Sequence, residues 1–213
     1  MKKSNLKDGQ ELPIVLIVVF LFFLVSLICA GCAPSQYVTT SVENYGQYIG
    51  NYDNKTVQAF ITSFFPEKIE DYFANITYSY RAEKADSYAF EAYLSFNVED
   101  EVVYNSVVET FTAGLKQSVF RYDNKYYEYV LVDEFLPNSE VNYDGYIHIR
   151  YAKIGKILCN PEKQEIIFVA LGVYDGGVAK TNFLTVYFDR FDINPREYAE
   201  HAIPSYILNH NEG

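Results

Sequence analysis

The sequence predicts an α+β fold, with a mainly antiparallel sheet of about six strands. Several segments alternate apolar and polar residues, as half-buried strands do. Predicted helices and strands are also segregated along the chain, in the order helix, two strands, helix, four strands, helix, whereas a parallel α/β fold would alternate them. The chain has 213 residues, 49% hydrophobic and 17% aromatic, which is enough apolar material for one such domain.

The first element, residues 1–32, is predicted to be a signal peptide or a membrane anchor. Lys2, Lys3 and Lys7 precede an uncharged apolar run from Pro13 to Ala30, and no basic residue follows until Lys55. This asymmetry places the N-terminus in the cytoplasm and the remainder of the chain outside it. An apolar run of about 18 residues can also span a bilayer as an uncleaved single-pass anchor.

The apolar run ends in Ile28-Cys29-Ala30-Gly31-Cys32. This segment resembles the lipobox of bacterial lipoproteins, in which small residues precede a cysteine that is cleaved and lipidated, although Cys29 stands where that family usually has leucine. The resemblance implies that Cys32 carries the lipid, palmitate included, at a cell membrane. The chain as a whole resembles membrane lipoproteins of bacteria that make little use of disulfides, and this wider likeness implies no activity. A lipoprotein and an uncleaved anchor are both open at this stage.

Residues 33–53 are expected to form a tether, because they are rich in Ser, Thr, Asn, Gln, Gly and Tyr without clear periodicity. A single extracytoplasmic domain is then expected over residues 54–213. It should begin with a short amphipathic helix before Pro66, because apolar residues recur at helical spacing there: Val57, Phe60, Ile61 and Phe64.

Two alternating segments, 76–82 and 88–98, predict a β-hairpin that turns near Lys84-Ala85-Asp86. Each segment has one apolar and one mostly polar face, which indicates a sheet covered on a single side. A helix should follow, with Glu99-Asp100-Glu101 at the positive end of its dipole. Its apolar stripe consists of Val103, Val107, Val108, Phe111 and Leu115.

The remaining elements are predicted to be four strands and a short C-terminal helix. The strands cover residues 125–133, 146–158, 164–174 and 181–190, with a bulge or bend expected at Gly155. Turn-forming pairs such as Asp144-Gly145 separate them. Asp192 or Asn194 should cap the last helix, with Pro195 in its first turn.

Composition narrows the function. The formal net charge is −11, from 17 basic and 28 acidic residues, and such an anionic surface argues against nucleic-acid binding. If the N-terminal segment is removed, Cys159 is the only cysteine left, so no intramolecular disulfide is expected.

The sequence contains no pattern that predicts a catalytic site, a metal site or a cofactor. There is no Gly-x-Ser-x-Gly elbow, Walker loop or dinucleotide-binding glycine pattern. The three histidines, His148, His201 and His210, are too scattered to predict a metal site.

Tyrosine is the unusual residue, with 21 copies and no tryptophan. Tyr93, Tyr127 and Tyr129 are out of phase with their apolar neighbours and are expected on a second face of the sheet, where they could bind a ligand. Cross-strand pairing would explain them equally well. We therefore expect a membrane-tethered binding or interaction domain with a protein, peptide or saccharide ligand. The alternatives are a cell-envelope hydrolase with dispersed catalytic residues and a purely structural envelope component.

Overall fold

The computed structural model describes residues 36–49, 63–83, 89–137, 148–173, 179–180, 185–194 and 197–198. The chain divides into two units, Met1–Ser35 and Gln36–Gly213, and every described residue belongs to the second. The apolar run, Cys32 and most of the helix expected before Pro66 lie outside the described residues. Within the part that is described, no helix is both long and apolar enough to cross a membrane.

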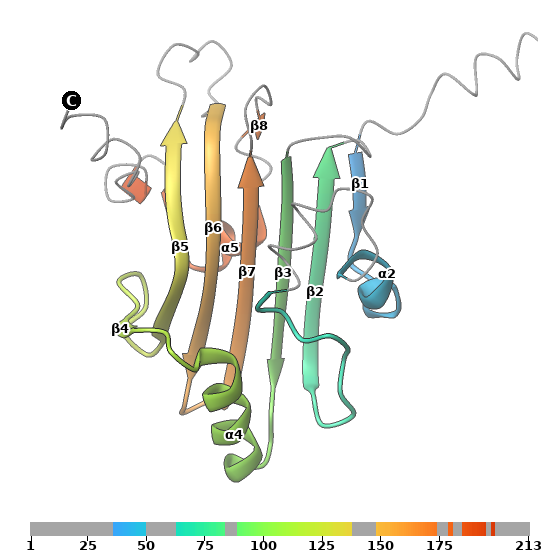
Figure 1. The fold of residues 1–213 in the computed structure, drawn as a ribbon, viewed down its shortest axis with the longest axis vertical. Helices are drawn as coiled ribbons and strands as arrows, with labels where there is room; N and C mark the ends of the chain where they lie inside the picture. The colour runs from blue at the N-terminus through green and yellow to red at the C-terminus, as the bar shows by residue number, and fades with distance from the viewer. Residues whose placement is uncertain are drawn as a thin grey trace, which may run out of the picture. The chain divides into compact units, whose positions relative to one another are not determined.

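The described residues form one antiparallel sheet of eight strands (Figure 1). The strand order is β1-β2-β3-β7-β6-β5-β4, and β8 pairs with β6. The strands are β1 (Gln36–Thr39), β2 (Ala74–Glu83), β3 (Ala89–Asn97), β4 (Gln117–Val119), β5 (Tyr127–Pro137), β6 (His148–Asn160), β7 (Glu165–Val173) and β8 (Ala179–Lys180). The predicted α+β class and mainly antiparallel sheet are confirmed. The strand number is higher than expected because β1, β4 and β8 have only four, three and two residues, too few to show alternation.

The described helices are η1 (Val42–Asn44), α2 (Tyr45–Ile49), α4 (Glu101–Thr112) and α5 (Thr185–Arg190). The helix expected after the first hairpin is confirmed as α4. The Asp100 carboxylate caps it by accepting hydrogen bonds from the backbone N–H groups of Val102 and Val103, at 2.8 and 3.0 Å. By contrast, part of the expected tether is folded, because β1 pairs with β2 and Tyr45 of α2 is buried.

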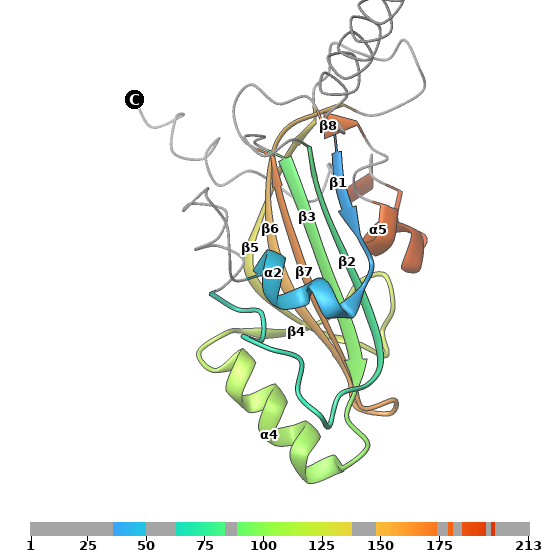
Figure 2. The same ribbon diagram turned by 90° about the vertical axis from the view of Figure 1, so that its right-hand side faces the viewer.

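Helices cover both faces of the sheet (Figure 2). We call the face toward α2 and α4 the first face. Its strand residues include Leu94, Phe96 and Phe168, which form one apolar cluster with Tyr104 and Val107 of α4. The face toward α5 is the second face, and its residues include Tyr93, Ile167 and Val169, in a cluster with Tyr187 and Phe188 of α5.

The expectation of a sheet covered on one side is therefore wrong. All nine residues of β7 are buried, which requires cover above and below this central strand. The error came from the polar residues that β3 places on the second face, such as Glu91 and Ser95, which are 2% exposed. Polar residues on one face of a strand therefore predict that this face is exposed to solvent only when no other element covers it.

The expected strand over residues 181–190 is also wrong in its second half, since Thr185–Arg190 forms α5. The run Thr185-Val186-Tyr187-Phe188 contains good strand formers. Packing overrides this propensity, because a helix lets Tyr187 and Phe188 enter the second-face cluster. Farther along the chain, Tyr198 N–H donates to Asn194 O at 2.9 Å, as expected for a helix that begins near Asn194.

Candidate functional site

The candidate site is a pocket of about 310 Å³ on the second face. It lies where β5 and β6 approach the turn after β4 and the segment that contains Tyr198. The floor residues, Lys156 and Tyr198, are each 3% exposed, whereas Val119 at the rim is 58% exposed. The lining residues are Val119, Arg121, Tyr122, Glu128, Asp133, Lys156 and Tyr198.

Lys156 is the central polar residue of the pocket. Its Nζ lies 2.9 Å from Glu128 Oε1 and 2.6 Å from Asp133 Oδ2. A buried ammonium is costly unless it is paired and hydrogen-bonded, and two carboxylates meet that requirement here. Nζ also lies 5.0 Å from the ring centroid of Tyr198, within the range of a cation–π interaction.

A β-bulge brings the two carboxylates together. Glu128 and Asp133 are five residues apart, so in a regular strand they would point to opposite faces. The register between β5 and β6 shifts between Val130 and Val132, and this extra residue restores Asp133 to the second face. A bend was expected at Gly155. The structure places the irregularity in β5, opposite Gly155.

Two tyrosines, Tyr122 and Tyr198, complete the lining of the pocket. The Tyr198 hydroxyl donates to Asp133 Oδ1 at 2.6 Å. Burial raises the pKa of this phenol well above its ordinary value, so the group remains a donor at neutral pH. The Tyr122 and Tyr198 rings are nearly parallel, with centroids 6.2 Å apart. The guanidinium carbon of the exposed Arg121 lies 5.9 Å from the Tyr122 ring centroid.

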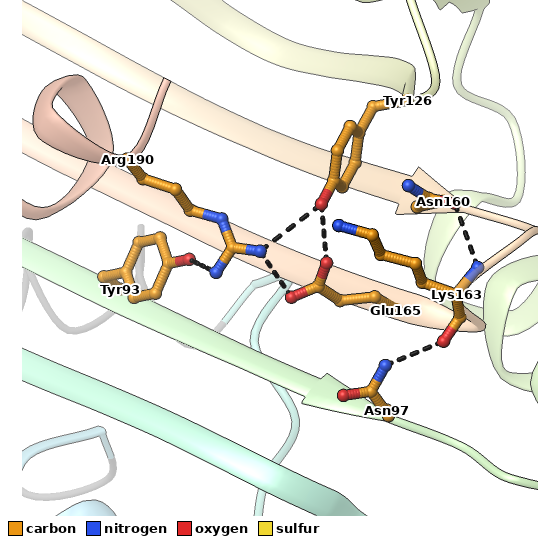
Figure 3. A network of polar contacts seen from close by, with 7 residues as sticks. All are labelled: Tyr93, Asn97, Tyr126, Asn160, Lys163, Glu165 and Arg190. Carbon is orange, nitrogen blue, oxygen red and sulfur yellow. Dashed lines mark hydrogen bonds and ion pairs between the residues drawn. The ribbon is translucent and has the colours of Figure 1, made fainter. Parts of the chain in front are cut away.

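A second polar network anchors α5 to the sheet (Figure 3). From the end of α5, Arg190 donates through Nη1 to the Tyr93 hydroxyl at 2.8 Å and through Nη2 to Glu165 Oε1 at 2.6 Å. The Tyr126 hydroxyl donates to the other carboxylate oxygen of Glu165, also at 2.6 Å. Phe188 of the same helix packs on Tyr198 at a centroid distance of 5.1 Å. Anchoring α5 therefore also helps to position Tyr198 at the floor of the pocket.

The turn between β6 and β7 is fixed by the remaining contacts in Figure 3. Asn97 donates from its side-chain amide to Lys163 O at 2.7 Å, and Asn160 Oδ1 accepts from Lys163 N–H at 3.1 Å. These contacts hold the ends of β3, β6 and β7 together, beside Glu165. Glu165, which accepts from Arg190, directly follows this turn.

The start of α5 is bound by Glu91 of β3. This carboxyl group accepts hydrogen bonds from the backbone N–H groups of Tyr187 and Val186. Burial raises its pKa to about 8, although the nearby Arg81 charge and those two hydrogen bonds lower it. Glu91 is thus largely protonated at neutral pH, and α5 is held at both ends by side chains from the sheet.

The three tyrosines singled out from the sequence do not lie together. Tyr93 pairs in register with Val169 on the second face, where it is 1% exposed. Tyr127 and Tyr129 pair with Cys159 and Ile157 on the first face. Tyr129 is 9% exposed and Tyr127 is 39% exposed. The expectation that they share a face is wrong, because Tyr93 of β3 lies on the second face whereas Tyr127 and Tyr129 of β5 lie on the first.

No group of three or more His, Cys, Asp or Glu side chains within the described ranges could hold a metal ion. His148 lies in β6, and His201 and His210 lie outside the described residues. Cys159 is buried and not in a disulfide, and burial raises the pKa of its thiol to about 12. A thiol that stays protonated is a poor nucleophile.

A second cavity, of about 300 Å³, lies at the start of α4. Its charged lining residues, Asp71, Glu99 and Asp100, are all acidic, and capping of α4 explains Asp100. Its described lining residues do not include a buried ammonium paired with two carboxylates, which distinguishes the first pocket.

Sequence reasoning missed Glu128, Asp133, Lys156 and Tyr198. The only sequence signal was the unusual Lys156 within an apolar strand, between Ile154 and Ile157. Comparison with protein families, with characterised proteins and with solved structures finds no match for this chain. The pocket itself is therefore the feature from which a function can be inferred.

Proposed function

We propose that this chain is a membrane-tethered, extracytoplasmic binding domain whose ligand enters the pocket around Lys156. The observation that carries the proposal is the buried ammonium held between Glu128 and Asp133 at the floor of a 310 Å³ pocket. Ligand sites commonly combine a concave shape with a few fixed polar groups. The Tyr198 hydrogen bond and the anchored α5 hold these groups in place before any ligand arrives.

The tether is supported by the sequence. The apolar run Pro13–Ala30 follows three lysines, and Cys32 ends the segment that resembles a lipobox. The mass of the chain extracted from membranes tests this part. A lipidated chain that begins at Cys32, together with loss of the lipid in Cys32→Ala, is the expected result. An intact chain that begins at Met1 or Lys2 would overturn the claim for Cys32 and leave the single-pass anchor.

An envelope hydrolase is the second candidate, because the pocket does bring two carboxylates together. Acid–base catalysis by such a pair requires one protonated and one ionised group. Here a single ammonium binds both carboxylates. This arrangement favours binding over hydrolysis.

Binding is tested by blocking the pocket. Val119→Arg should fill the rim without disturbing the floor, because Val119 is 58% exposed. The matched control is Val102→Arg, at a 78% exposed position of α4. Amino acids, short peptides, sugars and carboxylic acids are screened with the full chain in detergent for a rise in unfolding temperature. We expect at least one compound to stabilise the wild type and Val102→Arg but not Val119→Arg. Equal responses in all three proteins, or none in any, would contradict the proposal.

A further inference from the structure

The charges of the pocket are arranged by depth. At the floor, one ammonium faces two carboxylates, so the formal charge of this group is −1. At the rim, Arg121 is exposed and lines the same pocket. The interior therefore favours a positive group, and the rim favours a negative one.

The hydrogen-bond acceptors of Glu128 and Asp133 also favour a positive ligand group. Among the described residues, Lys156 donates a hydrogen bond to Glu128 and forms an ion pair with Asp133, and the Tyr198 hydroxyl donates a hydrogen bond to Asp133. Two ionised carboxylates can accept about eight hydrogen bonds. The floor thus has a surplus of acceptors, and a ligand group with several N–H donors would use it.

The aromatic rings are poorly placed for stacking against a sugar. Tyr198 is 3% exposed, and its ring already contacts Lys156 and Tyr122. Tyr122 is half-buried, and the guanidinium group of Arg121 lies near its ring. Among the described lining residues, a saccharide that relies on an open ring face would find none, so polar contacts must dominate recognition.

The volume, about 310 Å³, is at the small end of ligand pockets. Together with the charge arrangement, the geometry points to a small zwitterion, which we propose is an α-amino acid or the amino end of a short peptide. Its ammonium group binds Glu128 and Asp133, and its carboxylate faces Arg121. This inference rests on the proposed binding function and names the ligand class for the same pocket.

Isothermal titration calorimetry of the full chain in non-ionic detergent tests the ligand class. The probes are L-alanine, L-alanyl-L-alanine, N-acetyl-L-alanine, L-alaninamide and D-glucose. N-Acetyl-L-alanine lacks the ammonium group and should bind at least about tenfold more weakly than L-alanine, the loss expected for a charge-assisted hydrogen bond. L-Alaninamide keeps the ammonium group and lacks the carboxylate, so it should lose only the contribution of Arg121. The tighter of L-alanine and L-alanyl-L-alanine identifies the source of the ammonium group.

Two variants assign the two ends of the ligand. Arg121→Met should weaken the binding of L-alanine to the level of L-alaninamide and leave the binding of L-alaninamide unchanged. Lys116→Met, at another exposed position, should change the affinity for neither compound. Asp133→Asn should weaken the binding of both L-alanine and L-alaninamide. Because Arg121 is exposed, its variant remains folded even if Asp133→Asn does not, and it keeps the test decisive.

The outcomes separate the ligand class from the binding function. Binding of D-glucose or N-acetyl-L-alanine as tight as that of L-alanine, and weakened by Val119→Arg, would overturn the zwitterion and leave the binding function intact. Absence of binding by L-alanine, L-alanyl-L-alanine and L-alaninamide would also overturn the ligand class. In that case, stabilisation by another compound in the blocking experiment would show that the binding function still holds.

Discussion

Both faces of the sheet bury an apolar cluster, but they differ in how many buried polar groups they contain. On the first face, α4 and the strands bury a nearly continuous apolar cluster that includes Phe96 and Phe168, whose rings are stacked at 6.0 Å. On the second face, α5 is held by side chains that carry charge or hydrogen bonds, among them Glu91, Glu165 and Arg190. Apolar burial stabilises with little demand on geometry, whereas buried polar groups are favourable only when they are paired. Both faces bury an apolar cluster, but the second face adds paired, buried polar groups and is therefore where a specific site can be built.

The largest expected effect is on the first face. Phe168 is fully buried and contacts the rings of Phe65, Phe96 and Phe111. Phe168→Ala should lower the free energy of unfolding by about 4 kcal/mol, because it removes buried surface and leaves a cavity. Chemical unfolding followed by circular dichroism measures this loss. Val102→Ala, at an exposed position of α4, should change stability by less than about 0.5 kcal/mol. A loss below about 1 kcal/mol for Phe168→Ala would contradict the role given to this face.

The second largest loss of stability is expected at the pocket floor. Lys156→Met should lower the free energy of unfolding by about 3 kcal/mol, because it leaves Glu128 and Asp133 without their shared cation. Adding Glu128→Gln and Asp133→Asn to the same chain should restore part of the loss. If Lys156→Met is as stable as the wild type, the ion pairs do not organise the second face.

The free energy of unfolding should also depend on pH, through Glu91 on the second face. The pKa of Glu91 is about 8 in the folded chain, above the value near 4.5 of an exposed carboxyl group. Between these values the unfolded chain has released the proton that the folded chain retains, so stability should fall as pH rises from about 4.5 to 8. The expected slope is about 1.4 kcal/mol per pH unit.

Glu91→Gln isolates this effect, because the neutral amide keeps the shape and an oxygen acceptor for the α5 backbone. Its unfolding free energy should lack this slope, while Glu162→Gln, at an exposed position, should retain it. Parallel profiles for the wild type and Glu91→Gln would show that Glu91 is not protonated in the folded chain.

The smallest effect concerns the tyrosines. Tyr93→Phe removes the hydroxyl group that accepts from Arg190, and should cost about 1 kcal/mol of unfolding free energy. Tyr127→Phe, on the first face and 39% exposed, should cost almost nothing. Equal losses in the two variants would argue against a distinct hydrogen-bonding role for Tyr93.

Most of the fold was predictable from the sequence because its long elements have strong patterns. The hairpin of β2 and β3, helix α4, and strands β5, β6 and β7 all match expected segments. The errors have a common physical origin in tertiary packing. Residues Thr185–Arg190 have strand propensity and yet form α5, and the polar residues of β3 face a helix rather than solvent.

The candidate site was not predictable by the same reasoning. Its carboxylates share a face only because of the bulge between Val130 and Val132, and a bulge has no reliable signal in a single sequence. Tyr198 reaches Asp133 from 65 residues away. The tyrosines chosen from their alternation, Tyr93, Tyr127 and Tyr129, instead serve the two cores or lie at the surface.

The most direct test of the ligand proposed for the second face is a pair of crystal structures of the full chain, one grown with L-alanine and one with L-alanyl-L-alanine. We expect at least one of the two ligands in the pocket, with its amino nitrogen within hydrogen-bond distance of Glu128 or Asp133 and its carboxylate toward Arg121. A pocket that is empty in both crystals at a saturating concentration, or a ligand bound elsewhere on the chain, would contradict the proposed ligand class.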